Sequence, residues 1–224
     1  MSIIVLLSCR QQILKTLRNC LSCFAVFLAL AILVSCSPGD NGVTPSPSVV
    51  VTAVSETADS FHITPPEGWV VIPMKSYEAH DYIASANGDP KFSAASLRVQ
   101  HWSPEALRVV FERYSEKPIV IDMYGYRDSD IASAKTVDGI SDIEVLPDRV
   151  IGGDPAVGYS CLQEKDGVGQ RYEDWFVGRH DGLWRFVLNS APGETVVPSE
   201  VRAALDTVAW GPPEPSASPS ATES

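Results

Sequence analysis

Alternating hydrophobic positions in the C-terminal half predict three consecutive strands, at residues 155–164, 169–180 and 183–190. The dipeptides Asp166-Gly167 and Asp181-Gly182 separate them, and Asp-Gly between alternating strands is a strong hairpin signal. A two-residue turn at Asp181-Gly182 would pair the flanking residues as follows: Arg179 with Trp184, Val177 with Phe186, and Trp175 with Leu188. The pattern therefore predicts an antiparallel meander.

One face of this expected sheet collects large apolar side chains and suits a core: Trp175, Val177, Trp184, Phe186 and Leu188. Val157, Tyr159 and Cys161 alternate in the preceding strand, and we expect them to join the same face.

Helical spacing predicts two helices. Ser103-Pro104-Glu105 supplies an N-cap, a first-turn proline and an early acid. The apolar residues that follow recur on one helical face and end before Pro118: Leu107, Val110, Phe111 and Tyr114. A last helix, 198–208, places four apolar residues on one side: Val201, Ala204, Leu205 and Val208.

The remaining elements are shorter or less regular. Strands are expected at 61–64, 69–73 and 91–102. Residues 119–140 give a mixed pattern, with a strand indicated by IVIDMYGY and a helical turn by DSDIASAK. Helices that cover a face of an antiparallel meander make an α+β domain.

The first 35 residues have the layout of an export signal. Arg10, Lys15 and Arg18 precede the uncharged stretch 21–35. An uncleaved membrane anchor is the alternative, but its 15 residues fall short of the roughly 20 that a membrane-spanning helix needs.

The residues Leu33-Val34-Ser35-Cys36 resemble the bacterial lipobox. The resemblance implies that the Cys36 thiol receives a diacylglyceryl group and that the chain is cut before it. Two acyl chains give stable membrane anchoring. We therefore expect a protein held to the cell membrane by its lipid, on the extracytoplasmic side.

The composition divides the chain into four segments. We predict a lipoprotein signal peptide at 1–35, a lipidated N-terminus and flexible tether at 36–58, one domain at 59–211, and a disordered Pro/Ser-rich tail at 212–224. All five tryptophans lie within the domain, which favours a single body.

The charge of the chain is strongly negative beyond the signal segment. Residues 37–224 hold all 28 Asp and Glu residues against 14 of the 17 Lys and Arg, a net charge of −14. Such a body repels phosphate backbones, so we expect no nucleic-acid partner.

The segment FHITPPEGWVVIP (61–73) resembles the opening of the PsbP-like group, which includes DcrB-like and actinobacterial LpqN lipoproteins. Three later segments fit the same pattern: GGDPAVGYSC, DGLWRFVL and PSEVRAALDTVAW. The resemblance covers about 61–210, without 119–140. It implies a PsbP-like fold and a role as a binding or assembly module, with no shared catalytic residues.

Few residues point to chemistry. GYSCL lacks the last glycine of a hydrolase elbow. Cys161 is expected to be a buried thiol, although pairing with a histidine would make it a nucleophile. Glu173 and Asp174 are expected on opposite strand faces. The four histidines have no close ligand spacing, and we interpret an acidic loop as solvated surface: Asp122, Asp128 and Asp130.

We therefore expect no catalytic, metal or cofactor site. We expect instead a non-catalytic module that binds a protein or cell-envelope component through its helix–sheet edge or through residues 119–140. Two alternatives remain open. One is an exported envelope hydrolase whose site forms only in the fold. The other is a domain that only spaces an envelope complex.

Overall fold

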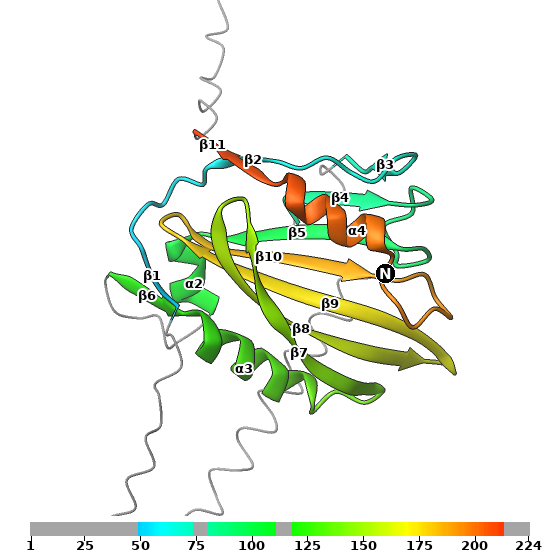
Figure 1. The fold of residues 1–224 in the computed structure, drawn as a ribbon. Helices are drawn as coiled ribbons and strands as arrows, with labels where there is room; N and C mark the ends of the chain where they lie inside the picture. The colour runs from blue at the N-terminus through cyan, green and yellow to red at the C-terminus, as the bar shows by residue number, and fades with distance from the viewer. Residues whose placement is uncertain (1–48, 74–79, 111–117, 213–224) are drawn as a thin grey trace, which may run out of the picture. The chain divides into compact units, whose positions relative to one another are not determined.

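The computed structural model describes residues 49–73, 80–110 and 118–212 (Figure 1), all within one compact unit, Pro45–Ser224. The predicted signal peptide (1–35), the predicted lipid attachment at Cys36 and all but the first residue of the predicted tail (212–224) lie outside the described residues.

An antiparallel sheet of seven strands dominates the fold, in the order β3-β4-β5-β10-β9-β8-β7. Its strands are β3 (Val70–Val71), β4 (Tyr82–Ser85), β5 (Ser96–Trp102), β10 (Gly182–Asn189), β9 (Val168–Arg179), β8 (Asp154–Lys165) and β7 (Ile140–Ile151). Two further ribbons each pair two strands: β1 (Val50–Ala53) with β6 (Ile119–Asp122), and β2 (Ser60–His62) with β11 (Ala209–Gly211). The helices are α2 (Pro104–Val110), α3 (Met123–Ala134), α4 (Ser199–Ala204) and the 3-10 turn η3 (Leu205–Thr207). This confirms the α+β class.

The predicted meander is confirmed, with one correction to its register. Asp166 and Gly167 both have positive φ and form the two-residue turn between β8 and β9. The second turn consists of His180 and Asp181, because Gly182 already pairs with Arg179.

Trp184 therefore lies opposite Val177, and Phe186 opposite Trp175, two residues from the predicted pairing. Only a glycine fits at this first position of β10, because the φ of Gly182 is +130° and a Cβ there would overlap the carbonyl oxygen of Trp102. A shift of two residues keeps every side chain on its face of the sheet.

The predicted core face is confirmed, and we name it the tryptophan face: Trp175, Val177, Trp184, Phe186 and Leu188. The apolar side of α4 and η3 packs against it through Val201, Ala204, Leu205 and Val208, as predicted. Figure 1 shows α4 lying over the sheet between β5 and β2.

The prediction that Val157, Tyr159 and Cys161 share this face is wrong. The register of β8 with β9 places Gly158 opposite Trp175, and Val157 opposite Phe176, so these three residues belong to the other face. Both faces of β8 are buried from Ala156 to Cys161, so the larger residues at the odd positions do not by themselves indicate which of the two buried faces they join.

The opposite face is covered by α3 and the β1–β6 ribbon. The strand expected across IVIDMYGY stops at Asp122, whose carboxylate accepts a hydrogen bond from Gly125 N at 3.1 Å and caps α3. The helix then runs for 12 residues and buries Met123, Tyr126, Ile131 and Ala134. The N-cap thus overrides the β propensity of the tyrosines.

The ordered domain begins before residue 59. Val50–Ala53 pair with β6, so the segment predicted as a tether, 36–58, includes a strand of the fold. Its run of valines and threonine favours a strand once a partner is available. The long edge strand β7 has no counterpart in the sequence-based prediction, and its two register shifts and Pro147 suit an edge.

The remaining local predictions are largely confirmed. Ser103 Oγ accepts from Ala106 N at 3.2 Å and caps α2, whose Leu107 is fully buried. The strand expected at 91–102 begins only at Ser96. Phe111 and Tyr114 of the predicted helix lie outside the described residues.

Because β8 lies close to Trp175, we expect an added methyl group to destabilise the protein at Gly158 and to have little effect at Gly169. A Cβ there would lie 2.6 Å from Trp175 Cε3 and 2.7 Å from Asp174 O. We expect Gly158→Ala to lower the free energy of unfolding by about 1–3 kcal/mol in urea denaturation. In Gly169→Ala, the matched change in β9, the nearest atom would be 3.5 Å away, and the effect should stay within about 1 kcal/mol. Equal effects of the two variants would contradict this packing.

Candidate binding pocket

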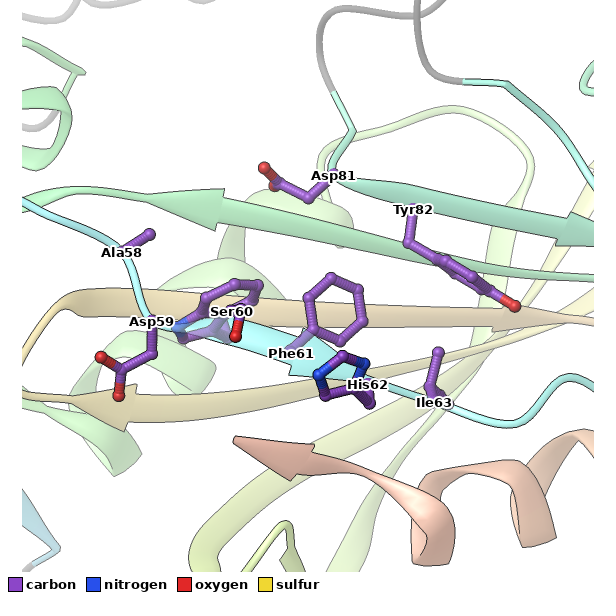
Figure 2. A pocket seen from close by; sticks show the side chains of 9 residues that line it. Ala58, Asp59, Ser60, Phe61, His62, Ile63, Asp81 and Tyr82 are labelled. Carbon is purple, nitrogen blue, oxygen red and sulfur yellow. The ribbon is translucent and has the colours of Figure 1, made fainter. Parts of the chain in front are cut away.

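A pocket of about 550 Å³ opens where β2 passes the start of β4 (Figure 2). Nine residues from three separate parts of the chain line it: Ala58, Asp59, Ser60, Phe61, His62, Ile63, Asp81, Tyr82 and Trp184. The fold alone brings these parts together, because β2 lies across the tryptophan face instead of joining the main sheet.

Aromatic rings form the wall of the pocket and hold β2 in place. The Phe61 ring lies 5.2 Å from that of Trp184 and 5.9 Å from that of Tyr82, both edge-on. Trp210, opposite Phe61 in the β2–β11 ribbon, is 6.4 Å away. Edge-to-face pairs of this kind add to the energy of burial. Phe61 therefore anchors the strand that carries most of the pocket.

A single arginine secures the pocket strand beside its lining. Arg179 NH2 lies 2.8 Å from Asp59 Oδ2, NH1 contacts Asp154 Oδ2, and Nε is 3.6 Å from Asp181 Oδ1. The guanidinium also sits over the Trp210 ring at 4.1 Å. Its side chain is only 10% exposed. We name these four residues the Arg179 cluster: Asp59, Asp154, Arg179 and Asp181.

Asp181 connects the turn to the pocket. Its side chain is fully buried, and it accepts hydrogen bonds from Asp59 N at 2.9 Å and from Trp184 Nε1 at 3.3 Å. Its carbonyl oxygen lies 2.9 Å from His101 Nε2. One residue of a hairpin turn thus fixes β2, β10 and β5 relative to one another.

The rim of the pocket is polar. Ser60 Oγ donates to Pro212 O at 2.8 Å, and Asp81 Oδ2 accepts from His101 N at 2.6 Å. Burial raises the pKa of Asp81. Burial also raises the pKa of Tyr82 to about 12, so its hydroxyl stays protonated at neutral pH and can donate. Within residues 49–73, 80–110 and 118–212 that hydroxyl has no hydrogen-bond partner, and its oxygen is buried behind the rim.

The pocket contains one histidine and two carboxylates, but each carboxylate already has a partner. Asp59 is held by Arg179, and Asp81 by the backbone of His101. Ser60 directs its proton to a backbone carbonyl. The arrangement suits recognition of a ligand with an apolar part and a polar edge more than proton transfer to a nucleophile.

Cys161 does not contribute to the pocket. It lies on the opposite face of the sheet and is 5% exposed. Burial, followed by the negative charge of Asp174, raises the pKa of the Cys161 thiol to about 11. The thiol is therefore protonated at neutral pH and is a poor nucleophile.

Glu173 and Asp174 point to opposite faces, as predicted, and both are buried. Glu173 Oε1 accepts from Arg202 at 2.5 Å, and Asp174 Oδ1 accepts from Arg185 Nε at 2.5 Å. Glu173 thus forms a structural ion pair with α4, and Asp174 forms one with β10.

The three aspartates of the predicted acidic loop have separate roles. Asp122 caps α3, Asp128 pairs with Arg127 at 2.8 Å, and Asp130 accepts from the Tyr159 hydroxyl at 2.9 Å. In the part of the chain that the structure describes, no three His, Cys, Asp or Glu side chains gather as candidate metal ligands.

Two histidines not assigned a role from the sequence lie at the pocket. His62 is exposed on its rim, and the His101 ring lies 4.4 Å from that of Trp184 behind its wall. The only sequence signal for this site is Phe61 in FHITPPEGW, since its contacts with Tyr82 and Trp184 join three separate parts of the chain that only the fold brings together.

Comparisons with known proteins identify one solved structure of interest. No family model and no curated protein matches the chain. The chain is similar to LpqN, described as involved in cell envelope biogenesis of Mycobacterium tuberculosis, with a TM-score of 0.45 and 12% sequence identity over 75% of this chain and 93% of LpqN. Among the described helices, none is both long and apolar enough to cross a membrane.

The Arg179 cluster predicts a large loss of stability when its cation is removed. Arg179→Met would leave Asp59 and Asp181 buried without a counter-charge, and we expect the free energy of unfolding to fall by about 3 kcal/mol or more. Arg149→Met removes an ion pair whose acid, Asp206, is 69% exposed, and should cost at most about 1 kcal/mol. Thermal and urea denaturation of both variants test this, and a mild effect at Arg179 would contradict it.

Proposed function

We propose that the protein is an exported lipoprotein, anchored to the cell membrane by a lipid on Cys36, whose PsbP-like domain is a non-catalytic binding or assembly module of the cell envelope. The lipobox Leu33-Val34-Ser35-Cys36 and the export layout before it support the anchor. The protein would be held to the membrane by this covalent lipid, and its domain would lie on the extracytoplasmic side. The partner would be a protein or another envelope component.

The shape and lining of the pocket support the proposed binding role. Its wall consists of three aromatic side chains, and its rim offers the Ser60 hydroxyl, the His62 imidazole and the Asp81 carboxylate. The carboxylates that would have to act as acid and base already have partners: Asp59 is paired with Arg179, and Asp81 accepts from the backbone of His101. A rigid aromatic wall with a few polar groups recognises a ligand without transforming it.

An envelope hydrolase is the second candidate, because His62, Asp59 and Asp81 line one pocket. For catalysis, one carboxylate would have to leave its present partner and orient His62 toward a substrate or water. The experiment below separates the two roles.

The anchor predicts the behaviour of a single substitution. In Cys36→Ala no thiol is available for the thioether, so we expect lipid labelling and membrane retention to be lost. Metabolic labelling with a radioactive or clickable fatty acid and membrane fractionation measure both. Cys23→Ala is the matched control, a cysteine in the same apolar segment, and should behave as the unmodified protein. Retention of labelled Cys36→Ala would overturn the anchor.

The pocket predicts a site-specific crosslink. A photoreactive phenylalanine analogue at His62, which is exposed on the rim, should capture the partner in intact cells, while the same probe at Val168, exposed in the β8–β9 hairpin, should not. Mass spectrometry then identifies the captured molecule. The binding role predicts that it is recovered unchanged after incubation with the purified protein.

Cleavage of that molecule, lost in Asp81→Asn, would support the hydrolase instead. Equal capture from both positions would argue against the pocket as the binding site.

A further inference from the structure

The β1–β6 ribbon has a largely apolar outer surface, with a single β6 carboxylate, Asp122, at the end where it pairs with Val50. Val50 is 50% exposed, Val54 is 68% exposed and Val120 is 51% exposed. Val50 and Val54 flank Thr52, which pairs directly with Val120. These four side chains form one patch, which we name the ribbon face: Val50, Thr52, Val54 and Val120.

The core does not need this surface. The alternate residues of the ribbon face inward: Ala53, Ile119 and Ile121 are 2%, 1% and 0% exposed. The orientation is held at both ends, because Val54 N and Ser55 N donate to His180 O at 2.8 Å and Met123 N donates to Val49 O at 3.1 Å. The valines are therefore presented outward on a fixed scaffold. Figure 1 shows β1 and β6 side by side at one end of the main sheet, near α2.

The position of the ribbon in the chain indicates what it meets. Val50 is 14 residues after Cys36, and a chain of that length spans at most ~50 Å even when fully extended. The ribbon is thus the first element of the described fold after the proposed lipid. Only one charged residue, Asp40, lies between them.

The size and charge of the patch favour a lipid surface over a second protein. Three half-exposed valines offer on the order of 200 Å² of apolar area. A stable protein interface needs about 800 Å² from each partner. A small patch is sufficient when a covalent anchor already holds it at high local concentration beside its target. The four residues of the ribbon face are themselves uncharged, and the carboxylate that borders them, Asp122 opposite Val50, is bound to Gly125 N as the cap of α3. The rest of the acidic body gains nothing from anionic headgroups.

We propose that the ribbon face rests on the lipid bilayer to which Cys36 anchors the chain, so that the domain has a preferred orientation at the membrane. This inference rests on the proposed lipid anchor. The valines would insert between headgroups, and the contact would depend on apolar burial and little on salt.

The test uses the lipidated full-chain product, purified from a bacterial host and reconstituted in phosphatidylcholine vesicles that contain a brominated lipid. An environment-sensitive fluorophore is attached at Val54→Cys or Val120→Cys, with Val168→Cys as the control position. We expect a blue shift and at least roughly twofold stronger quenching at 54 and 120 than at 168, retained at high salt. The mass of the purified protein reports lipidation separately, so failure of the anchor and failure of the contact are distinguished.

A matched pair of triple variants tests the valines themselves, with the probe at Thr52→Cys. Val50→Ser, Val54→Ser and Val120→Ser together should lower the ratio of surface-bound to free domains by roughly tenfold. The control changes three exposed valines elsewhere, Val145→Ser, Val150→Ser and Val168→Ser, and should leave that ratio unchanged.

Two outcomes would overturn the proposal. Equal or absent quenching at all positions of a lipidated, vesicle-bound protein would show that the ribbon face does not touch lipid. A blue shift that disappears at one protein per vesicle would assign the face to a second copy of the chain.

Discussion

Both faces of the central strands β8, β9 and β10 are buried, and much of the structure follows from the need to cover one sheet twice. The tryptophan face is covered by α4, η3 and the β2–β11 ribbon, and the opposite face by α3 and the β1–β6 ribbon. Each ribbon has only two strands, and such a ribbon is marginal in isolation. Their stability therefore comes from the sheet below, and the pocket exists because one of these covers crosses the sheet without joining it.

Covering a sheet twice also requires each buried charge to find a partner on its own face. The neighbours Glu173 and Asp174 point to opposite faces and meet Arg202 of α4 and Arg185 of β10. Asp181, fully buried, meets Arg179. Removing one member of such a pair costs several kcal/mol, because the other is left buried and unpaired. Of these pairs, Glu173–Arg202 joins the sheet to a cover and therefore helps to specify how α4 sits on it.

The sequence predicts most of what is local. Asp-Gly turns, alternating strands and the apolar side of 198–208 are present as expected. The error of two residues in the predicted β9–β10 register left the predicted core face unchanged, because a shift of two keeps each side chain on its face. The face of Val157, Tyr159 and Cys161 could not be predicted, since β8 is buried on both sides. The strand Val50–Ala53 was missed because its partner, β6, lies some 70 residues away. The pocket was missed for the same reason: Phe61 meets Tyr82, Trp184 and Trp210 only after folding.

The two proposed surfaces lie close together in the chain, and this limits how the protein can work. Five residues separate Val54 on the ribbon face from Ser60 in the pocket strand, a span of at most ~20 Å. That connection is also pinned at its ends, by His180 O at Val54 and by Arg179 at Asp59. With the ribbon face on lipid, the pocket would be held at a nearly constant, short height above the bilayer. A partner recognised there would be one that presents its apolar and polar parts beside the membrane surface, and one that remains distant in the envelope would be out of reach.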